Sequence, residues 1–166
     1  MKTLLLVRHA KSSWSDSSLP DFERSLNDRG KHDAPAMAKR LKNKDIDIDL
    51  FISSPAKRAK KTAELFMEEL DAPKKKPDLI DELYEASVDN FYHAIESIKD
   101  KHDTVALFSH NPGITNFINS LSSTPVADMP TCAIYAIGVD TKNWADFKNA
   151  EKKFLFFDYP INANVQ

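Results

Sequence analysis

Two histidines and two arginines follow apolar segments that are far apart in the chain. Arg8 and His9 directly follow one apolar run, His110 follows another, and Arg58 lies shortly after a third. Arginine presents a planar fork of donors that matches phosphate oxygens, and a neutral imidazole can attack phosphorus and hold the phosphoryl group covalently. Fixed cations also stabilise the charge that spreads over the oxygens in the transition state. Together these four residues indicate phosphoryl transfer.

The apolar runs predict strands that would bring these residues to one edge of a sheet. Residues 4–7, 49–53 and 104–108 are runs typical of strands buried on both faces. Residues 133–139 and 154–157 predict two further strands, and residues 78–83 a short extended piece. Between the strands, apolar spacing predicts helices from Asn27 or Asp28 to Lys42, and over residues 55–70, 88–99 and 114–121. Ser54 is expected to cap the second helix, with Pro55 at its first position.

The alternation of strands and helices predicts an α/β fold, a three-layer α/β/α sandwich with a mostly parallel central sheet. The chain has 166 residues, which fits a single domain over residues 1–166. In such folds ligands bind beyond the carboxyl ends of the strands. Arg8, His9, Arg58 and His110 are therefore expected to meet there.

The composition argues against several classes of partner. The formal net charge is −2, which gives no sign of nucleic-acid or membrane binding, and the single cysteine, Cys132, excludes an intrachain disulfide. The apolar start of the chain stops at Arg8, too early for a signal peptide or a membrane span, so a cytoplasmic location is expected. Two histidines also suggest a metal site, but arginine is not a ligand and would repel a cation. We therefore expect no metal and no cofactor.

Two polar segments of the sequence are unusual. Residues 11–28 form a long polar stretch, and loops of that length in a compact domain are usually functional or mobile. The helix expected from residue 55 carries Lys57, Arg58, Lys60 and Lys61 in its first turns, where cations oppose the helix dipole. A bound anion would offset this for Arg58, and we interpret the three lysines as solvated.

Each of these four residues has an ordinary structural explanation when taken alone, so the hypothesis of phosphoryl transfer depends on their occurring together.

Four sequence motifs along nearly the whole chain then match one protein family, in the order in which that family has them. Arg8-His9-Ala10-Lys11 resembles the Arg-His-Gly signature of the histidine phosphatase superfamily, with its phosphoglycerate mutase-like fold, and Ala10 replaces the usual glycine. Residues 26–30 resemble the start of that family's first helix, residues 53–63 its second-arginine segment, and residues 109–113 its second-histidine segment. The short length, residues 11–14 and the Asn-Pro-Gly after His110 point to the SixA-like branch, which is similar to phosphohistidine phosphatases.

The resemblance implies a role for each site residue. His9 would be the nucleophile, and Arg8, Arg58 and His110 would form the phosphate pocket with it. In many relatives a glutamate after the second-arginine helix protonates the leaving group, and Glu82 is the best positional match. Two neighbouring carboxylates, Glu85 and Asp81, remain alternatives for this role. Ser15 stands where some relatives bind phosphate through an asparagine.

The resemblance also implies a metal-independent phosphatase acting on phosphohistidine or another phosphorylated protein side chain, because a short chain has little room for a roof over the site. Inorganic phosphate would be the product, with no nucleic-acid or membrane partner. One alternative is a phosphatase of small phosphomonoesters in the same superfamily. Another is a non-catalytic phosphate-binding module, although the presence of both His9 and His110 argues for activity.

Overall fold

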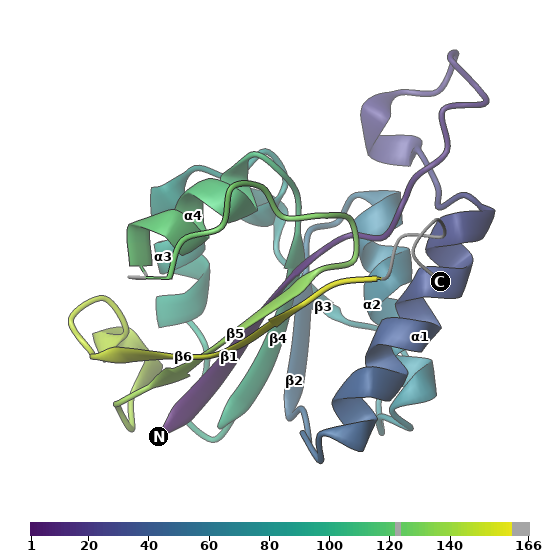
Figure 1. Ribbon diagram of the computed structural model, residues 1–166. Coiled ribbons are helices and arrows are strands. Elements are labelled where there is room, and N and C mark those ends of the chain that lie inside the picture. The colour runs from purple at the N-terminus through teal and green to yellow at the C-terminus, as the bar shows by residue number, and fades with distance from the viewer. Residues whose placement is uncertain (122–123, 161–166) are drawn as a thin grey trace.

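The computed structural model describes residues 1–121 and 124–160, and residues 122–123 and 161–166 lie outside that description. Within the described part, six strands form one sheet in the order β3-β2-β4-β1-β5-β6 (Figure 1). The strands are β1 Lys2–Arg8, β2 Leu50–Ser53, β3 Asp78–Leu79, β4 Thr104–Ser109, β5 Ile134–Val139 and β6 Lys152–Asp158. The helices are α1 Asp28–Asn43, α2 Lys57–Glu69, α3 Val88–Glu96 and α4 Gly113–Leu121, with short 3-10 helices at Asp21–Glu23, Asp81–Leu83 and Trp144–Asp146. None of the helices in this described part has the length and apolar character needed to cross a bilayer.

The sheet is mostly parallel, as the sequence predicts. The pairs β1–β4, β2–β4 and β2–β3 are parallel, whereas β5 runs antiparallel to both β1 and β6. Strand β1 lies inside the sheet, between β4 and β5, and its residues from Leu4 to Val7 are fully buried. The carboxyl ends of β1, β2 and β4 therefore meet at one edge, and this edge carries the polar residues singled out above.

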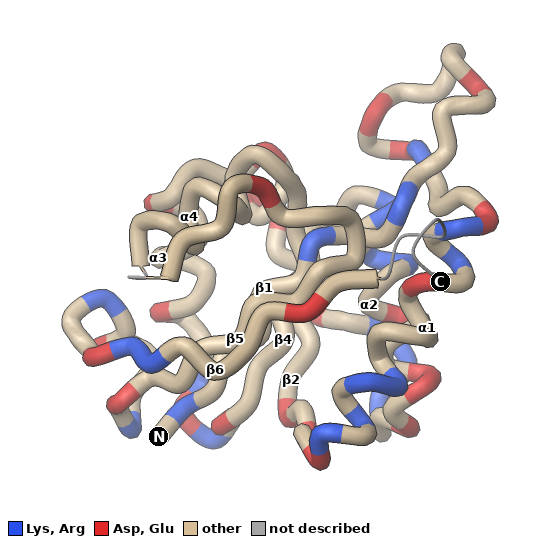
Figure 2. The backbone as a smooth tube through the Cα atoms, in the orientation of Figure 1, with Lys and Arg blue, Asp and Glu red and all other residues tan. Residues whose placement is uncertain are grey.

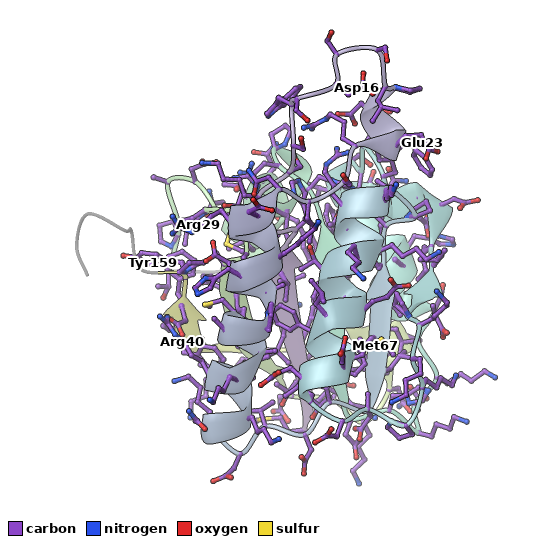
Figure 3. All side chains as sticks on the ribbon, turned by 90° about the vertical axis from the view of Figure 1, so that its right-hand side faces the viewer. Asp16, Glu23, Arg29, Arg40, Met67 and Tyr159 are labelled. Carbon is purple, nitrogen blue, oxygen red and sulfur yellow. The ribbon has the colours of Figure 1, made fainter. Side chains whose placement is uncertain are left out.

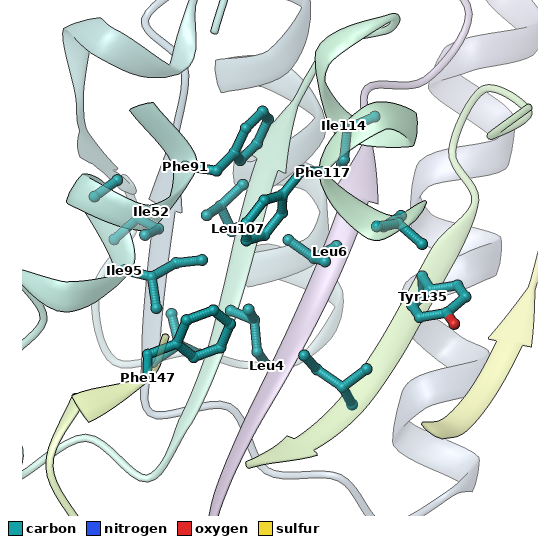
Figure 4. Close-up of a cluster of buried hydrophobic side chains, with 14 of the residues drawn as sticks. Leu4, Leu6, Ile52, Phe91, Ile95, Leu107, Ile114, Phe117, Tyr135 and Phe147 are labelled. Carbon is teal, nitrogen blue, oxygen red and sulfur yellow. The ribbon is translucent and has the colours of Figure 1, made fainter. Parts of the chain in front are cut away.

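Helices cover both faces of the sheet, which produces two separate hydrophobic cores. Successive residues of a strand point to opposite faces. Leu4 and Leu6 accordingly pack in the core with α3 and α4, which includes Phe91 and Phe117 and is drawn in Figure 4. Residues of β1 that point the other way join a second core with α1 and α2. Figure 1 shows these helix pairs on opposite sides of the sheet. The three-layer sandwich predicted from the alternating pattern is confirmed.

The largest differences from the predicted elements lie at helix ends. Helix α1 begins as predicted, because the Asn27 side chain accepts a hydrogen bond from Gly30 N at 2.9 Å. The predicted start of the second helix at residue 55 is wrong, since α2 begins at Lys57 with Ala56 as its N-cap. Ser54 does not cap the helix. Its Oγ accepts a hydrogen bond from Ala56 N at 3.2 Å and lies 2.7 Å from His110 Nε2. The predicted continuation of α3 to residue 99 is also wrong, since that helix ends at Glu96.

The polar loop between β1 and α1 is held against the start of α1. Ser12 forms an isolated antiparallel bridge with Leu26, and Asn27 N donates to Lys11 O at 3.0 Å. Figure 3 shows this loop, with Asp16 and Glu23, rising above the first turns of α1 and α2. The backbone of Lys11 lies so close to Gly30 that a Cβ built there would be 2.2 Å from the Lys11 carbonyl oxygen. Glycine at position 30 therefore allows the loop to pack onto the helix.

Gly30→Ala should destabilise the protein, because the added methyl group forces the loop and the helix apart. Alanine is the better helix former by about 1 kcal/mol, so the clash must outweigh that gain. We expect a net loss of about 1–3 kcal/mol in the free energy of unfolding, measured by urea denaturation. Gly138→Ala is the control, since the atom nearest to its Cβ is the flexible Met1 sulfur at 3.2 Å. Equal free energies of unfolding in the two variants would show that the loop can move away from the helix without a loss of stability.

Candidate active site

The four residues predicted to act together line one pocket. Arg8 and His9 come from the carboxyl end of β1, Arg58 from the first turn of α2, and His110 from the carboxyl end of β4. All four line a cavity of about 880 Å³. The rings of His9 and His110 have their centroids 5.0 Å apart and are tilted by 55°. The fold thus brings together residues that are more than a hundred positions apart in the sequence.

His9 is held as a neutral imidazole with a defined tautomer. Its Nδ1 lies 2.7 Å from the carbonyl oxygen of Ala10, and because a carbonyl only accepts, Nδ1 carries the proton. The lone pair is therefore on Nε2, where Arg58 Nε donates a hydrogen bond at 3.4 Å. Burial lowers the pKa of His9 to about 3, and the charges of Arg58 and Arg8 lower it further, against the Ala10 hydrogen bond. Near neutral pH the ring is therefore uncharged, and the lone pair on Nε2 accepts the hydrogen bond from Arg58.

A short chain of hydrogen bonds ties His9 to the helix that carries Arg58. Ala10 N donates to Thr62 Oγ1 at 3.0 Å, and the Thr62 hydroxyl donates to the Arg58 carbonyl oxygen at 2.8 Å. Both hydrogen bonds are buried. Together with the core packing between β1 and α2, Thr62 thus helps to hold Arg58 in position relative to His9.

Asp21 fixes the guanidinium of Arg58 from the loop side. Arg58 Nη1 donates to the Asp21 carbonyl oxygen at 2.7 Å, and Nη2 donates to the Asp21 carboxylate at 2.9 Å. The same carboxylate accepts hydrogen bonds from Tyr84 Oη at 2.7 Å and from Arg24. Partial burial would raise the pKa of Asp21, but hydrogen bonds from Tyr84 and Arg58, with the charge of Arg58, lower it to about 2. Asp21 is therefore ionised, and it leaves Arg58 Nε directed at His9.

His110 completes the pocket opposite His9. Its Nε2 lies 2.7 Å from Ser54 Oγ, and the Tyr84 ring packs edge-on against it at 5.5 Å. Burial lowers the pKa of His110 to about 3, and the nearby His9 and Arg58 act in the same direction. Ser54, predicted as a helix cap, instead orients a histidine of the site.

Two buried nitrogens in this pocket have no hydrogen-bond partner among the described residues, namely Arg8 Nε and His110 Nδ1. The Arg8 side chain is anchored at its other end, since Nη1 donates to the Met129 carbonyl oxygen at 2.7 Å. Buried polar groups are normally paired, so unpaired ones at a site call for a partner such as a ligand. Placed beside Arg58 and His9, these nitrogens suit an oxyanion.

The structure places two other predicted site residues outside this pocket. Glu82 does not line it, and its carboxylate lies 2.7 Å from Nδ1 of His93. Ser15 does not line it either, and its hydroxyl is paired with Ser13 Oγ at 2.8 Å. Of the carboxylates considered for the acid, Glu85 does line the pocket, and its backbone has the left-handed φ of 55°. Such a conformation is unfavourable for a non-glycine residue and is common at functional sites.

Several residues of the pocket are not identified by the sequence reasoning. Asp21, Arg24 and Tyr84 form the network around Arg58, and Trp14 lies over Arg24 with the guanidinium 3.5 Å from the ring centroid. The indole is 75% exposed at the rim of the pocket. The only signal for this group in the sequence is the length of the polar loop that contains most of it.

Comparisons with known proteins identify the family of the chain and its fold. The model of the histidine phosphatase superfamily (branch 1) matches residues 4–92, a segment that includes Arg8, His9 and Arg58. An uncharacterized chloroplastic protein of Arabidopsis thaliana is 37% identical over 70 residues, which is 42% of this chain and 32% of that protein. A 2,3-bisphosphoglycerate-dependent phosphoglycerate mutase of Bartonella bacilliformis is 33% identical over 78 residues, or 43% of this chain and 36% of the mutase. The matched segment thus spans about a third of the curated relatives.

The same fold occurs in a solved structure over almost the full length of both chains. A protein histidine phosphatase SixA complexed with tungstate superimposes with a TM-score of 0.81 at 22% identity, covering 99% of each chain. The three-layer sandwich is thus the phosphoglycerate mutase-like fold. Because the family match extends over more than half of the sequence and includes the first histidine and both arginines of the pocket, the chain belongs to the histidine phosphatase superfamily, branch 1.

Proposed function

We propose that this protein is a phosphatase that forms a transient phosphohistidine on His9 and acts on phosphorylated protein side chains, phosphohistidine above all. The observation that carries the proposal is the pair of unpartnered buried nitrogens, Arg8 Nε and His110 Nδ1, beside a neutral His9. A phosphoryl group bound in the pocket that Arg8, His9 and His110 line would offer acceptors to both nitrogens and would lie beside His9.

In the first step the lone pair of His9 Nε2 attacks phosphorus. The new P–Nε2 bond forms while the bond from phosphorus to the substrate nitrogen or oxygen breaks, and the leaving atom keeps the electron pair. When substrate binds, Arg58 Nε–H gives up its hydrogen bond to His9 Nε2, 3.4 Å away, for one to a phosphoryl oxygen. Arg58 and Arg8 then stabilise the negative charge on the equatorial oxygens. The Nδ1–H···O bond to Ala10 supports the positive charge that develops on the ring. His110 can donate from Nδ1 when the Ser54 hydroxyl donates to its Nε2.

In the second step water attacks the phosphoenzyme. The water oxygen bonds to phosphorus, the P–Nε2 bond breaks, and the electron pair returns to Nε2, which restores neutral His9. The water keeps one proton and passes the other to a phosphoryl oxygen, so inorganic phosphate leaves as dihydrogen phosphate. We propose that no metal is needed, because Arg8 and Arg58 supply the positive charge at the phosphoryl oxygens.

A substrate panel with the purified protein tests this proposal. The panel contains a phosphohistidine protein, a phosphoserine peptide and p-nitrophenyl phosphate, each with and without EDTA. We expect release of phosphate from the phosphohistidine protein, no effect of EDTA, and inhibition by phosphate and by vanadate, which imitates the transition state. Hydrolysis of p-nitrophenyl phosphate alone would favour a small-molecule phosphatase. Neither turnover nor labelling on the whole panel would favour a phosphate-binding module.

Paired substitutions test the source of the proton for the leaving group. We propose that Glu85, which lines the pocket, is better placed than Glu82, the choice that the family resemblance favours. Glu85→Gln should lower the turnover of the phosphoserine peptide, whose alkoxide leaving group needs a proton, by about 10²-fold, the usual scale of general acid catalysis. Phosphohistidine turnover should change less, because an imidazole leaving group can carry its own proton. Glu82→Gln is the matched control, and a larger loss in it would return the acid role to Glu82.

A further inference from the structure

A second hollow, separate from the catalytic pocket, lies between the first turns of α1 and α2. It has a volume of about 450 Å³, and its walls include five lysines and one glutamate in a chain whose formal net charge is −2. We call it the lysine groove and define it by Lys31, Lys57, Lys60, Lys61 and Lys76. Figure 2 shows Lys and Arg along α1 and α2 on the right-hand side of the molecule, and Figure 3 looks onto that side.

The positive charge of the groove is largely unneutralised within the described chain. Lys76 pairs with Glu64 at 3.1 Å, and Glu64 is the only carboxylate in the walls. No carboxylate of residues 1–121 or 124–160 forms an ion pair with Lys31, Lys57, Lys60 or Lys61. Four ammonium groups of the groove are thus available to a partner.

This arrangement works against the stability of α2. The helix has no acidic residue in its first turn, so the charges of Lys57 and Lys60 oppose its dipole there, and Lys61 follows in the second turn. Lys57 is also three and four positions from the other two, a spacing at which like charges repel. Folding alone therefore does not account for these lysines, whereas binding of an anionic partner would.

The lysine groove adjoins the catalytic pocket, since neighbouring residues of two segments line the two hollows. Along the loop, Arg24 lines the pocket while Ser25 and Leu26 line the groove. Along α2, Arg58 lines the pocket while Lys57 lines the groove. A phosphorylated side chain bound at His9 would therefore bring the surrounding surface of its protein over the groove, whereas a small phosphate ester would occupy the pocket alone.

We propose that the lysine groove is a docking surface for acidic side chains that flank the phosphorylated residue of a protein substrate. This inference rests on the proposed function and names the partner of the same site. The groove contains no aromatic side chain on which a base could stack, which argues against single-stranded nucleic acid. Its one apolar wall residue, Leu26, is buried, which argues against a membrane surface. Carboxylates of a protein fit both the charge and the position.

The test measures the activity of the unsubstituted protein and of a lysine-groove variant on two peptides. One phosphohistidine peptide carries glutamates on both sides of the phosphorylated residue, and the other carries glutamines there. The enzyme variant Lys57→Gln/Lys60→Gln/Lys61→Gln should lower kcat/KM for the glutamate peptide about tenfold and reduce its salt dependence. It should leave the glutamine peptide and p-nitrophenyl phosphate unchanged. The variant should also unfold at a slightly higher temperature, because the removed charges oppose the helix dipole.

Lys99→Gln/Lys101→Gln/Lys142→Gln is the control with the same loss of charge, since these lysines lie outside the groove. It should leave the preference for the glutamate peptide intact.

The docking role is overturned if the groove variant has the same kcat/KM as the unsubstituted protein for both peptides, or if it loses activity equally on every substrate. Protection of the groove lysines from chemical modification by an oligonucleotide, but not by the glutamate peptide, would assign the surface to nucleic acid. If the unsubstituted protein hydrolyses neither peptide but does hydrolyse p-nitrophenyl phosphate, the proposed function itself has failed.

Discussion

His9→Ala should abolish turnover and covalent labelling while leaving the phosphate site in place. The substitution removes the only nitrogen whose lone pair faces Arg58 Nε in the pocket, so no phosphoenzyme can form. We expect a loss of about 10⁴- to 10⁶-fold in kcat, the scale for removal of an essential nucleophile. Brief reaction with a radiolabelled substrate, followed by alkali and acid treatment, measures the acid-labile label. The unsubstituted protein should carry it and the variant should not.

The binding half of this prediction is measured by calorimetry with inorganic phosphate. Arg8, Arg58 and His110 remain in the variant, so phosphate should still bind. His32→Ala is the control, because that histidine is exposed and lies outside the pocket, and it should behave as the unsubstituted protein. An acid-labile label that survives in the His9 variant would move the nucleophile to another residue.

Arg58→Ala should lower kcat by about 10²- to 10³-fold, the scale for loss of one preorganised donor to the transition state. The guanidinium is held through Asp21 before substrate arrives, and its Nε already faces His9 Nε2. Charge stabilisation there needs little reorganisation, which is why the loss should fall on kcat as well as on KM. Steady-state kinetics on a phosphohistidine peptide separate the two parameters.

Arg40→Ala is a suitable control for that loss. Arg40 is also an arginine held by a carboxylate, since it pairs with Asp158 at 2.9 Å, but it lies in the last turn of α1 and away from the pocket. Its removal should affect stability slightly and leave kinetics unchanged. A loss in the Arg58 variant confined to KM would mean that Arg58 binds the ground state and the transition state equally.

Much of the fold follows from local patterns that the sequence contains in full. The apolar run before Arg8 has no polar interruption because both of its faces are covered, and such a run predicts a buried strand directly. The amphipathic spacing of α1 and its Asn27 cap likewise depend only on neighbouring residues. The start of α2 could not be obtained in this way. Ser54 has the residue type and position of a cap, yet its hydroxyl lies 2.7 Å from His110, more than fifty residues away in sequence.

The same distinction applies to the candidate site. Arg8, His9, Arg58 and His110 could be selected because each follows a predicted strand, and strand ends in an α/β fold meet at one edge. Asp21 stands in a loop without periodicity, and its relation to Arg58 and Tyr84 exists only after the loop folds over the pocket. Glu82 and Glu85 differ by three positions in sequence, yet Glu85 lines the pocket while Glu82 pairs with His93, a contact that exists only in the folded chain.

The central place of β1 has a consequence for the order in which activity can arise during synthesis. Leu4 pairs with Val105 on one side and with Ile137 on the other. A nascent chain on the ribosome therefore carries Arg8 and His9 long before the strands that flank them have been translated. Because β1 precedes β4 and β5 in the chain, a truncated product ending before β4 would contain the nucleophile without a site around it.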